Sequence, residues 1–177
     1  MIIQSIYQDA IKFAAIKHNG QVVPGTDMPY LVHLSNVAME ILVAAPYTED
    51  FDLSFAIAVA LLHDTIEDTD TSMEDIATAF SISISHAVSA LTKDTKLPKE
   101  ERIPDSLRRI QLQPKEVWAV KLADRITNLQ LAPAHWDSAK KEAYKNDAIL
   151  ILQMLKGGNA YLEQRLADRI GEYEKDI

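Results

Sequence analysis

Apolar residues recur along this chain at the three- and four-residue spacing of helices, and no segment of any length alternates with the two-residue period of a strand. Ile6, Ala10, Phe13 and Ala14 carry this spacing in the first segment. Further helices are predicted over residues 31–44, 53–67, 84–91, 104–113, 115–129, 136–155 and 159–175. The pattern indicates an all-α fold and a single domain over residues 1–177, in which the last helix, about 159–175, is peripheral.

The predicted helix over 53–67 is apolar on nearly every side, with Ser54 the only polar residue before His63. A helix that is apolar all round lies in the interior of a domain. After it, Thr71 and Glu74 have the spacing of a capping box, which predicts the start of a short helix.

The amino-acid composition excludes several classes of protein. Of 177 residues, 47% are apolar and 25% are charged, which is typical of a soluble globular protein. The absence of cysteine excludes disulfides, thiolate nucleophiles and thiolate metal sites. The net charge of −8 argues against a nucleic-acid partner, and no apolar run approaches the roughly 18 residues that span a membrane. Residues 1–4 lack the basic start of a secretory signal, so we expect a cytoplasmic protein.

The densest chemistry lies at the polar end of the buried helix, in the sequence His-Asp-Thr-Ile-Glu-Asp of residues 63–68. On a helix these residues are neighbours, so the segment gathers one imidazole and three carboxylates in one patch. Such carboxylates repel one another unless a cation or a proton compensates them. Two interpretations stay open here: a solvated helix end, in which Asp68 or Asp70 caps the next element, and a functional site.

Two residues elsewhere in the chain favour a site. His33 lies in the second predicted helix, and Asp124 lies inside an otherwise apolar helix. Together with His63 and Asp64 they offer two nitrogens and two carboxylates, which suit a divalent ion such as Mn²⁺, Fe²⁺ or Zn²⁺. Spacing alone does not assemble these residues, because they come from three separate helices.

Several segments carry a resemblance to a known family: His18–Gln21, Pro29–His33, Val37-Ala38, Ala60–Thr69, Leu97–Lys99 and Lys121–Leu129. They are similar to the HD-domain metal phosphohydrolases, and within them to the RelA/SpoT-type alarmone hydrolases with their small, single-domain Mesh1-like members. The likeness extends from the first helix to about Gly158. It implies an HD-type helical bundle around a metal site.

The resemblance also implies roles for individual residues. The metal ligands of the family, whose usual ion is Mn²⁺, fall on His33, His63, Asp64 and Asp124. The acidic pair that polarises water or moves protons falls on Glu67 and Asp68. The positions that contact substrate fall on Asn128, Lys99, Lys140 and Tyr144. The implied reaction uses a metal-activated water to remove 3′-pyrophosphate from a guanosine or adenosine alarmone such as ppGpp, while the oligomeric state stays unknown.

The sequence Leu-Ala-Asp-Arg-Ile occurs twice, around Asp124 and around Asp168. Asp124 follows an apolar run, whereas Asp168 lies among charged residues on an amphipathic helix. We therefore assign Asp124 to the metal and Asp168 to the surface. Lys93 and Lys96, which lie between two predicted helices, are interpreted as part of a solvated connection.

The chain departs from the family where the nucleotide base would lie. Many alarmone hydrolases carry basic residues just after Gly-Gln, but here no Lys or Arg lies between Gln21 and Pro29, and Leu131 stands where a polar residue is common. An HD phosphohydrolase that acts on another nucleotide, such as NADPH or a nucleoside phosphate, is therefore an alternative. A non-catalytic nucleotide-binding module is a second.

Overall fold

The computed structural model describes residues 2–129 and 136–176, and its regular elements are helices, as predicted. Within these ranges, the one paired piece of extended backbone is an isolated bridge between Val22 and Pro29. The helices are α1 (Ile3–Lys17), α2 (Leu31–Ala44), the 3-10 helix η1 (Ala45–Tyr47), α3 (Leu53–Leu62), α4 (Thr65–Asp68), α5 (Met73–Ala79), α6 (Ile82–Leu91), α7 (Lys99–Gln111), α8 (Lys115–Asn128), α9 (Ser138–Met154), α10 (Ala160–Tyr173) and η2 (Glu174–Asp176).

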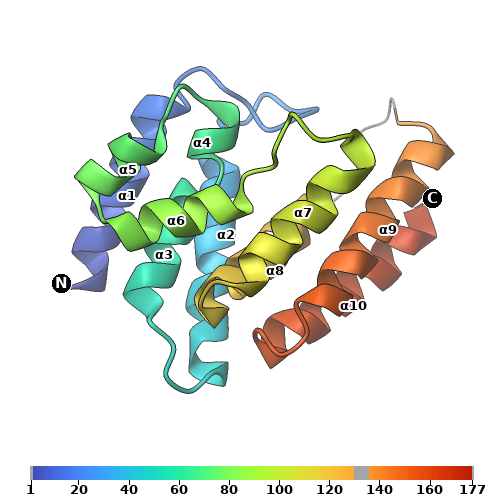
Figure 1. The fold of residues 1–177 in the computed structure, drawn as a ribbon. Helices are drawn as coiled ribbons and strands as arrows, with labels where there is room; N and C mark the ends of the chain where they lie inside the picture. Colours follow the sequence, from blue (N-terminus) through green and yellow to red (C-terminus); the bar gives the residue numbers. More distant parts are fainter. Residues whose placement is uncertain (1, 130–135, 177) are drawn as a thin grey trace.

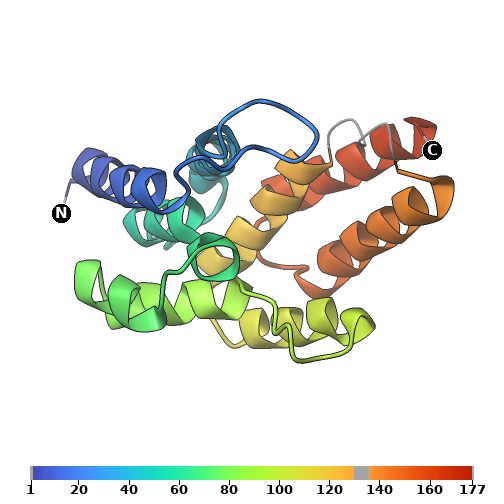
Figure 2. The same ribbon diagram turned by 90° about the horizontal axis from the view of Figure 1, so that it is seen from above.

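Helix α3 lies at the centre of the bundle, as its apolar sequence predicts. It packs against α1, α2, α6 and α8, and residues 56–62 of it are fully buried. Each large aliphatic side chain buried in this way contributes roughly 1.5–3 kcal/mol to folding. Helices α9 and α10 lie on the side of the molecule away from α1 (Figures 1 and 2), and they pack against α8, with further contacts from α9 to α7 and from α10 to α2.

The last helix is attached to the bundle by polar contacts as well as apolar ones. Asn159 caps α10, and its amide donates to the carbonyl of Ala44 and the hydroxyl of Thr48. Arg165 makes a two-point ion pair with the buried Glu40 of α2. These contacts hold α10 against the end of α2.

The predicted helix over 53–67 is wrong in one respect, because it breaks after Leu62 and resumes as the short helix α4. The imidazole of His63 donates from Nδ1 to the carbonyl of Ala60 at 2.8 Å. The hydroxyl of Thr65 donates to the carbonyl of Leu62 at 2.7 Å. These side chains occupy carbonyls that a continuing helix would need, and such local bonds compete with helical ones.

Smaller corrections concern the elements that follow. The capping box of α5 is formed by Ser72 and Asp75 instead of Thr71 and Glu74. Helix α6 begins two residues earlier than predicted, because Ser81 caps it. Helix α7 begins at Lys99 and contains Pro104, so the connection before it covers only residues 92–98.

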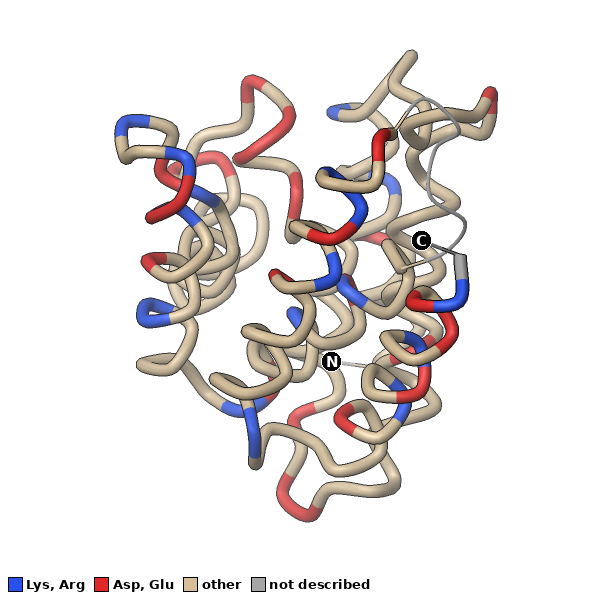
Figure 3. The backbone as a smooth tube through the Cα atoms, turned by 90° about the vertical axis from the view of Figure 1, so that its right-hand side faces the viewer, with Lys and Arg blue, Asp and Glu red and all other residues tan. Residues whose placement is uncertain are grey.

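No helix within the described ranges is long and apolar enough to cross a membrane. Basic and acidic positions alternate along the helices rather than gathering in one basic stripe (Figure 3).

Candidate metal centre and active site

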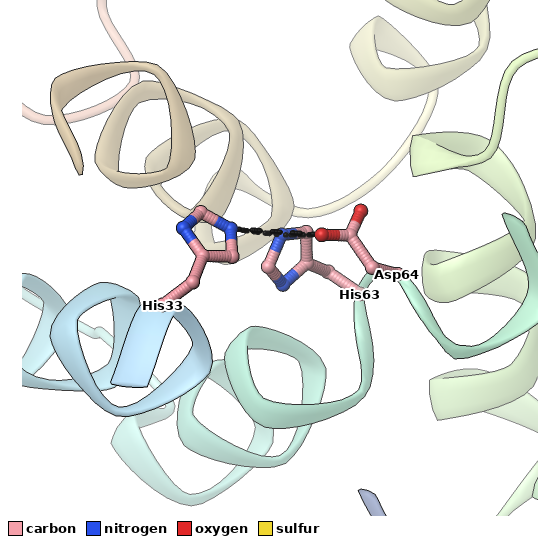
Figure 4. Close-up of side chains that lie close together, drawn as sticks. All are labelled: His33, His63 and Asp64. Carbon is pink, nitrogen blue, oxygen red and sulfur yellow. Dashed lines mark hydrogen bonds and ion pairs between the residues drawn. The ribbon is translucent and has the colours of Figure 1, made fainter. Parts of the chain in front are cut away.

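Four buried or half-buried side chains from three regions of the sequence meet beside the end of α3. His33 comes from α2, His63 and Asp64 follow α3, and Asp124 comes from α8. The two Nε2 atoms lie 3.3 Å apart. Asp64 Oδ2 lies 2.9 Å from Nε2 of His63 and 3.5 Å from that of His33 (Figure 4). Asp124 Oδ1 lies 3.6 Å and 3.5 Å from the same two nitrogens.

The break after α3 is what lets His63 and Asp64 face the same point. On a continuous helix of 3.6 residues per turn, consecutive side chains point about 100° apart. Asp64 instead has φ −99° and ψ −1°, and its carboxylate turns back toward its neighbour. His33, His63 and Asp64 thus present ligand atoms that all lie within 4.8 Å of one another.

Contacts on the far side of each imidazole fix which nitrogen carries the proton. His63 uses its Nδ1–H on the carbonyl of Ala60. The hydroxyl of Thr127 donates to the carbonyl of Asp124, so at 3.3 Å it can only accept from Nδ1 of His33. In its neutral form each imidazole therefore directs the Nε2 lone pair into the cluster, as metal-ligating histidines do.

The electrostatics of the cluster call for a cation. Burial opposes the charged form of His63, yet Asp64 and Asp124 outweigh it and hold the pKa of His63 well above its usual value. Burial likewise opposes ionisation of Asp124, but Lys121 and the histidines hold its pKa well below the usual range. Without an ion, the two carboxylates therefore favour a proton on the His63 imidazole, and a bound divalent ion would supply the same positive charge in place of that proton.

The spacing of these atoms fits one divalent ion. Nitrogen and oxygen ligands at about 2.1 Å from an ion lie roughly 3.0–3.4 Å from one another in tetrahedral or octahedral geometry. The measured separations between the histidine nitrogens and their neighbours, 2.9–3.6 Å, cover that range. The His/Asp cluster is therefore a site for a divalent metal ion.

Tyr30 is a member of the site that the sequence analysis missed. Its hydroxyl donates to Asp64 Oδ2 at 2.5 Å and lies 3.4 Å from Asp68 Oδ2. Burial and then the charge of Asp64 raise the pKa of this phenol, so it stays a donor. Its ring stacks on His18, whose Nδ1 contacts Gln21. The sequence feature that could have indicated this role is the position of Tyr30, three residues before His33 in one of the segments similar to the family.

Glu67 and Asp68 lie next to the cluster on α4 but differ in their surroundings. Both oxygens of Glu67 are bound by Lys93, one by its backbone N–H at 2.9 Å and the other by its ammonium group. Asp68 is held more loosely, and burial followed by the charges of Asp64 and Glu67 raises its pKa. Lys93 is thus part of the site, and its interpretation as a solvated residue is wrong.

The cluster opens into a cavity of about 630 Å³. Among the predicted site residues, those that line it are Asp64, Glu67, Asp68, Lys99, Asp124, Asn128 and Tyr144. Asn128 donates to Asp124 Oδ1 at 2.5 Å, which orients that carboxylate. The cavity is also lined by charged residues that the sequence analysis did not single out: Lys93, Glu100, Arg102, Lys121, Arg125 and Asp147.

Arg125 is the most buried of these cations. Its guanidinium lies 4.4 Å from the ring centre of Tyr144, and its Nε and Nη1 have no hydrogen-bond partner in the part of the chain that the structure describes. Tyr144 and Arg125 thus line the large cavity side by side, and burial raises the pKa of Tyr144 to about 12.

Lys140 is placed differently from the other predicted substrate residues. Its ammonium lies 4.3 Å from the ring centre of Trp136, and Lys140 lines neither of the two cavities at the site within residues 2–129 and 136–176. Trp136 itself lines a smaller, neighbouring cavity of about 280 Å³, which shares Asn128 and Tyr144 with the larger one.

The smaller cavity has an apolar wall in place of cations. Its lining includes Val23, Pro24 and Met28, from the segment between Gln21 and Pro29 that has no Lys or Arg, together with Val32 of α2. Leu131, the other departure from the family, lies outside the described residues.

The repeated pentapeptide offers a test with a built-in control. Asp168 is exposed and accepts a hydrogen bond from Gln164 on the same helix, far from the cluster. We expect Asp124→Ala to lose the bound metal and turnover, because it removes a ligand oxygen that both histidines face. Asp168→Ala, in the same sequence context, should keep the metal content and turnover of the unaltered protein. An inactive Asp168→Ala protein would show that the wrong copy was chosen.

An all-helical bundle with a His, His-Asp, Asp cluster at the end of its central helix defines a class of metal-dependent hydrolase. A model of the HD domain matches residues 10–155. The chain belongs to the HD-domain family, in the branch of the MESH1-type proteins.

Two relatives illustrate that branch. The guanosine-3′,5′-bis(diphosphate) 3′-pyrophosphohydrolase MESH1 of Danio rerio is 32% identical over 167 residues, which cover 92% of this chain and 91% of that protein. Its Homo sapiens counterpart is 31% identical over 163 residues, with 89% of both chains covered. A solved structure, described as a metazoan ortholog of SpoT that hydrolyses ppGpp, matches with a TM-score of 0.82 and 29% identity over 98% of this chain and 97% of the other.

Proposed function

We propose that this protein is a cytoplasmic, Mn²⁺-dependent hydrolase that removes 3′-pyrophosphate from a guanosine or adenosine alarmone such as ppGpp. The main support for the proposal is that the side chains of His33, His63, Asp64 and Asp124 converge on one point. Two further carboxylates and several cations line the cavity beside that point. Support for the substrate comes from the MESH1 relatives, whose similarity spans nearly the whole chain.

In this proposal His33, His63, Asp64 and Asp124 hold the ion. A divalent ion bound there lowers the pKa of a water molecule and offsets charge on the phosphoryl oxygens. Tyr30 and Asn128 keep the two ligand carboxylates in place by donating to them. The aspartates and imidazoles thus present their lone pairs in a fixed arrangement before substrate arrives, which is the preorganisation that catalysis requires.

Glu67 and Asp68 handle the attacking water and its proton. Water attacks the phosphorus bonded to the 3′ oxygen and the bond between that phosphorus and the 3′ oxygen breaks. The proton that the water gives up passes to the leaving 3′ oxygen, so the products are pyrophosphate and a 3′-hydroxyl. Carboxylates beside the cluster orient the water and accept its proton, a contribution of about 10²- to 10⁴-fold in rate. Lys99, Arg125 and the neighbouring Tyr144 offer the polyphosphate and the nucleoside their contacts.

A second candidate function follows from the smaller cavity. Its apolar wall around Val23 and Met28 offers no cation to a guanine base. An HD phosphohydrolase that acts on NADPH or another nucleoside phosphate through the same cluster is the alternative that this wall favours.

The test is a substrate panel with the metal-loaded protein: ppGpp, ppApp, NADPH and nucleoside monophosphates, each with Mn²⁺ and with excess chelator. We expect pyrophosphate release from ppGpp or ppApp that stops when the metal is removed. Phosphate release from NADPH or a monophosphate alone would support the second candidate. No product from any of these substrates would contradict an enzymatic function and favour a binding module.

A further inference from the structure

The ion pair between Lys93 and Glu67 indicates how one carboxylate of the site is positioned, an inference that rests on the proposed function. Lys93 lies in the connection over residues 92–98, which joins α6 to α7 along the wall of the large cavity. It gives both of its donors, the backbone N–H and the ammonium group, to the two oxygens of one carboxylate. Glu67 is therefore held at two points by a single residue.

Two-point binding determines the orientation of the carboxylate as well as its position. Oε2 accepts from the backbone of Lys93 at 2.9 Å, and Oε1 accepts from the ammonium group. A glutamate side chain has considerable rotamer freedom, which costs free energy to restrict. The backbone bond alone leaves Oε1 free to turn, so the ammonium group is what fixes the plane of the carboxylate beside the cluster.

The charge of Lys93 also suits its surroundings. Glu67 adds a negative charge next to Asp64, Asp68 and Asp124, which repel it. Burial opposes the charged form of Lys93, yet Glu67 outweighs burial and raises the pKa of the ammonium group. Lys93 therefore stays charged beside the Glu67 carboxylate.

The connection does not depend on Lys93 for its own structure. Arg109 of α7 donates to the carbonyls of Ser89, Ala90 and Thr92. Arg102 donates to the carbonyls of Thr95 and Leu97. These two arginines hold both ends of the segment, so a protein that lacks the Lys93 ammonium group should fold.

A role in binding phosphate is better filled by another lysine. Lys99 lines the same cavity, and its ammonium group has no hydrogen-bond or ion-pair partner among the described residues. The ammonium group of Lys93 is instead already committed to Glu67, which offsets its charge at the cavity wall. The observations thus connect Lys93 to the carboxylate rather than to the substrate.

We propose that Lys93 is a positioning residue, which acts through Glu67 by fixing that carboxylate toward the attacking water. Lys93→Met removes the ammonium group and keeps the backbone N–H and most of the apolar side chain. We expect kcat to fall about 10- to 100-fold, the range found when a residue that orients a metal-centre group is removed. KM, metal content and melting temperature should stay close to those of the unaltered protein.

A double-mutant cycle identifies the residue through which Lys93 acts. The four proteins are the unaltered chain, Lys93→Met, Glu67→Gln and the double variant, all assayed on the best substrate of the panel. If Lys93 acts through Glu67, the double variant should lose no more than about twofold beyond Glu67→Gln, within the scatter expected of such cycles. Lys93→Arg should recover most of the rate, because a guanidinium also binds a carboxylate at two points.

Lys96→Met is the matched control, because Lys96 is exposed on the same connection and does not line the cavity. It should keep the full rate. The proposal would be overturned if the losses in kcat of the two single variants multiplied in the double variant. It would also be overturned if Lys93→Met had a raised KM with unchanged kcat, or unchanged kinetics. A Lys93→Met protein that unfolds or loses its metal would overturn it as well. If the unaltered protein hydrolysed none of the substrates, the proposed function itself would be contradicted. The results for the variants test only the role of Lys93.

Discussion

Asp64→Ala should lose both the bound metal ion and turnover. Asp64 Oδ2 lies 2.9 Å from Nε2 of His63 and 3.5 Å from that of His33, which is where the proposed metal ion would bind. Removing a residue that merely orients a metal ligand costs about 10- to 100-fold in affinity, and removing a ligand costs more. Metal content measured by elemental analysis after gel filtration, together with pyrophosphate release, checks this expectation.

Asp70→Ala is the control for this variant. Asp70 lies on the same stretch of chain but is exposed, and it pairs with Lys17 at the surface. Surface pairs of this kind contribute about 0–1 kcal/mol to stability, so the variant should keep its metal and its rate. If Asp64→Ala retained one ion per chain, the assignment of Asp64 as a ligand would be wrong.

Glu67→Gln should have the opposite signature, with the metal retained and the rate reduced. The substitution keeps the size of the side chain but removes the charge that orients water and accepts its proton. A loss of about 10²- to 10⁴-fold in kcat is expected for a residue of this kind. Because both carboxylate oxygens of Glu67 are bound by Lys93, metal content should not change.

Glu74→Gln tests whether the effect is specific, since Glu74 is an exposed residue in the first turn of α5. It should behave like the unaltered protein in both measurements. If Glu67→Gln lost the metal, Glu67 would belong with the metal ligands and not with the acidic pair that handles the proton.

The helical pattern of the sequence was sufficient to predict the fold class and the central position of α3. Side chains that are apolar on every face leave a helix no stable place except the interior. The break after Leu62 could not be read from the same pattern, because it depends on bonds from His63 and Thr65 to carbonyls of the preceding turn. Those bonds decide where the chain stops being helical, and hydrophobic spacing does not register them.

The candidate site was predictable only in part, for a similar reason. The donor atoms of His33, His63, Asp64 and Asp124 could be chosen by their chemistry and by the resemblance. Lys93 could not, since a lysine in a charged connection looks the same in sequence whether it is solvated or paired. Its contact with Glu67 joins residues 26 positions apart and appears only in three dimensions.

Mn²⁺ located by anomalous diffraction from crystals of the protein tests the central claim most directly. We expect one strong peak among the two Nε2 atoms of His33 and His63 and the carboxylates of Asp64 and Asp124. The peak should be absent from crystals treated with chelator. A peak held elsewhere, or none at the cluster with Mn²⁺ in excess, would contradict the claim that these four side chains form the metal centre.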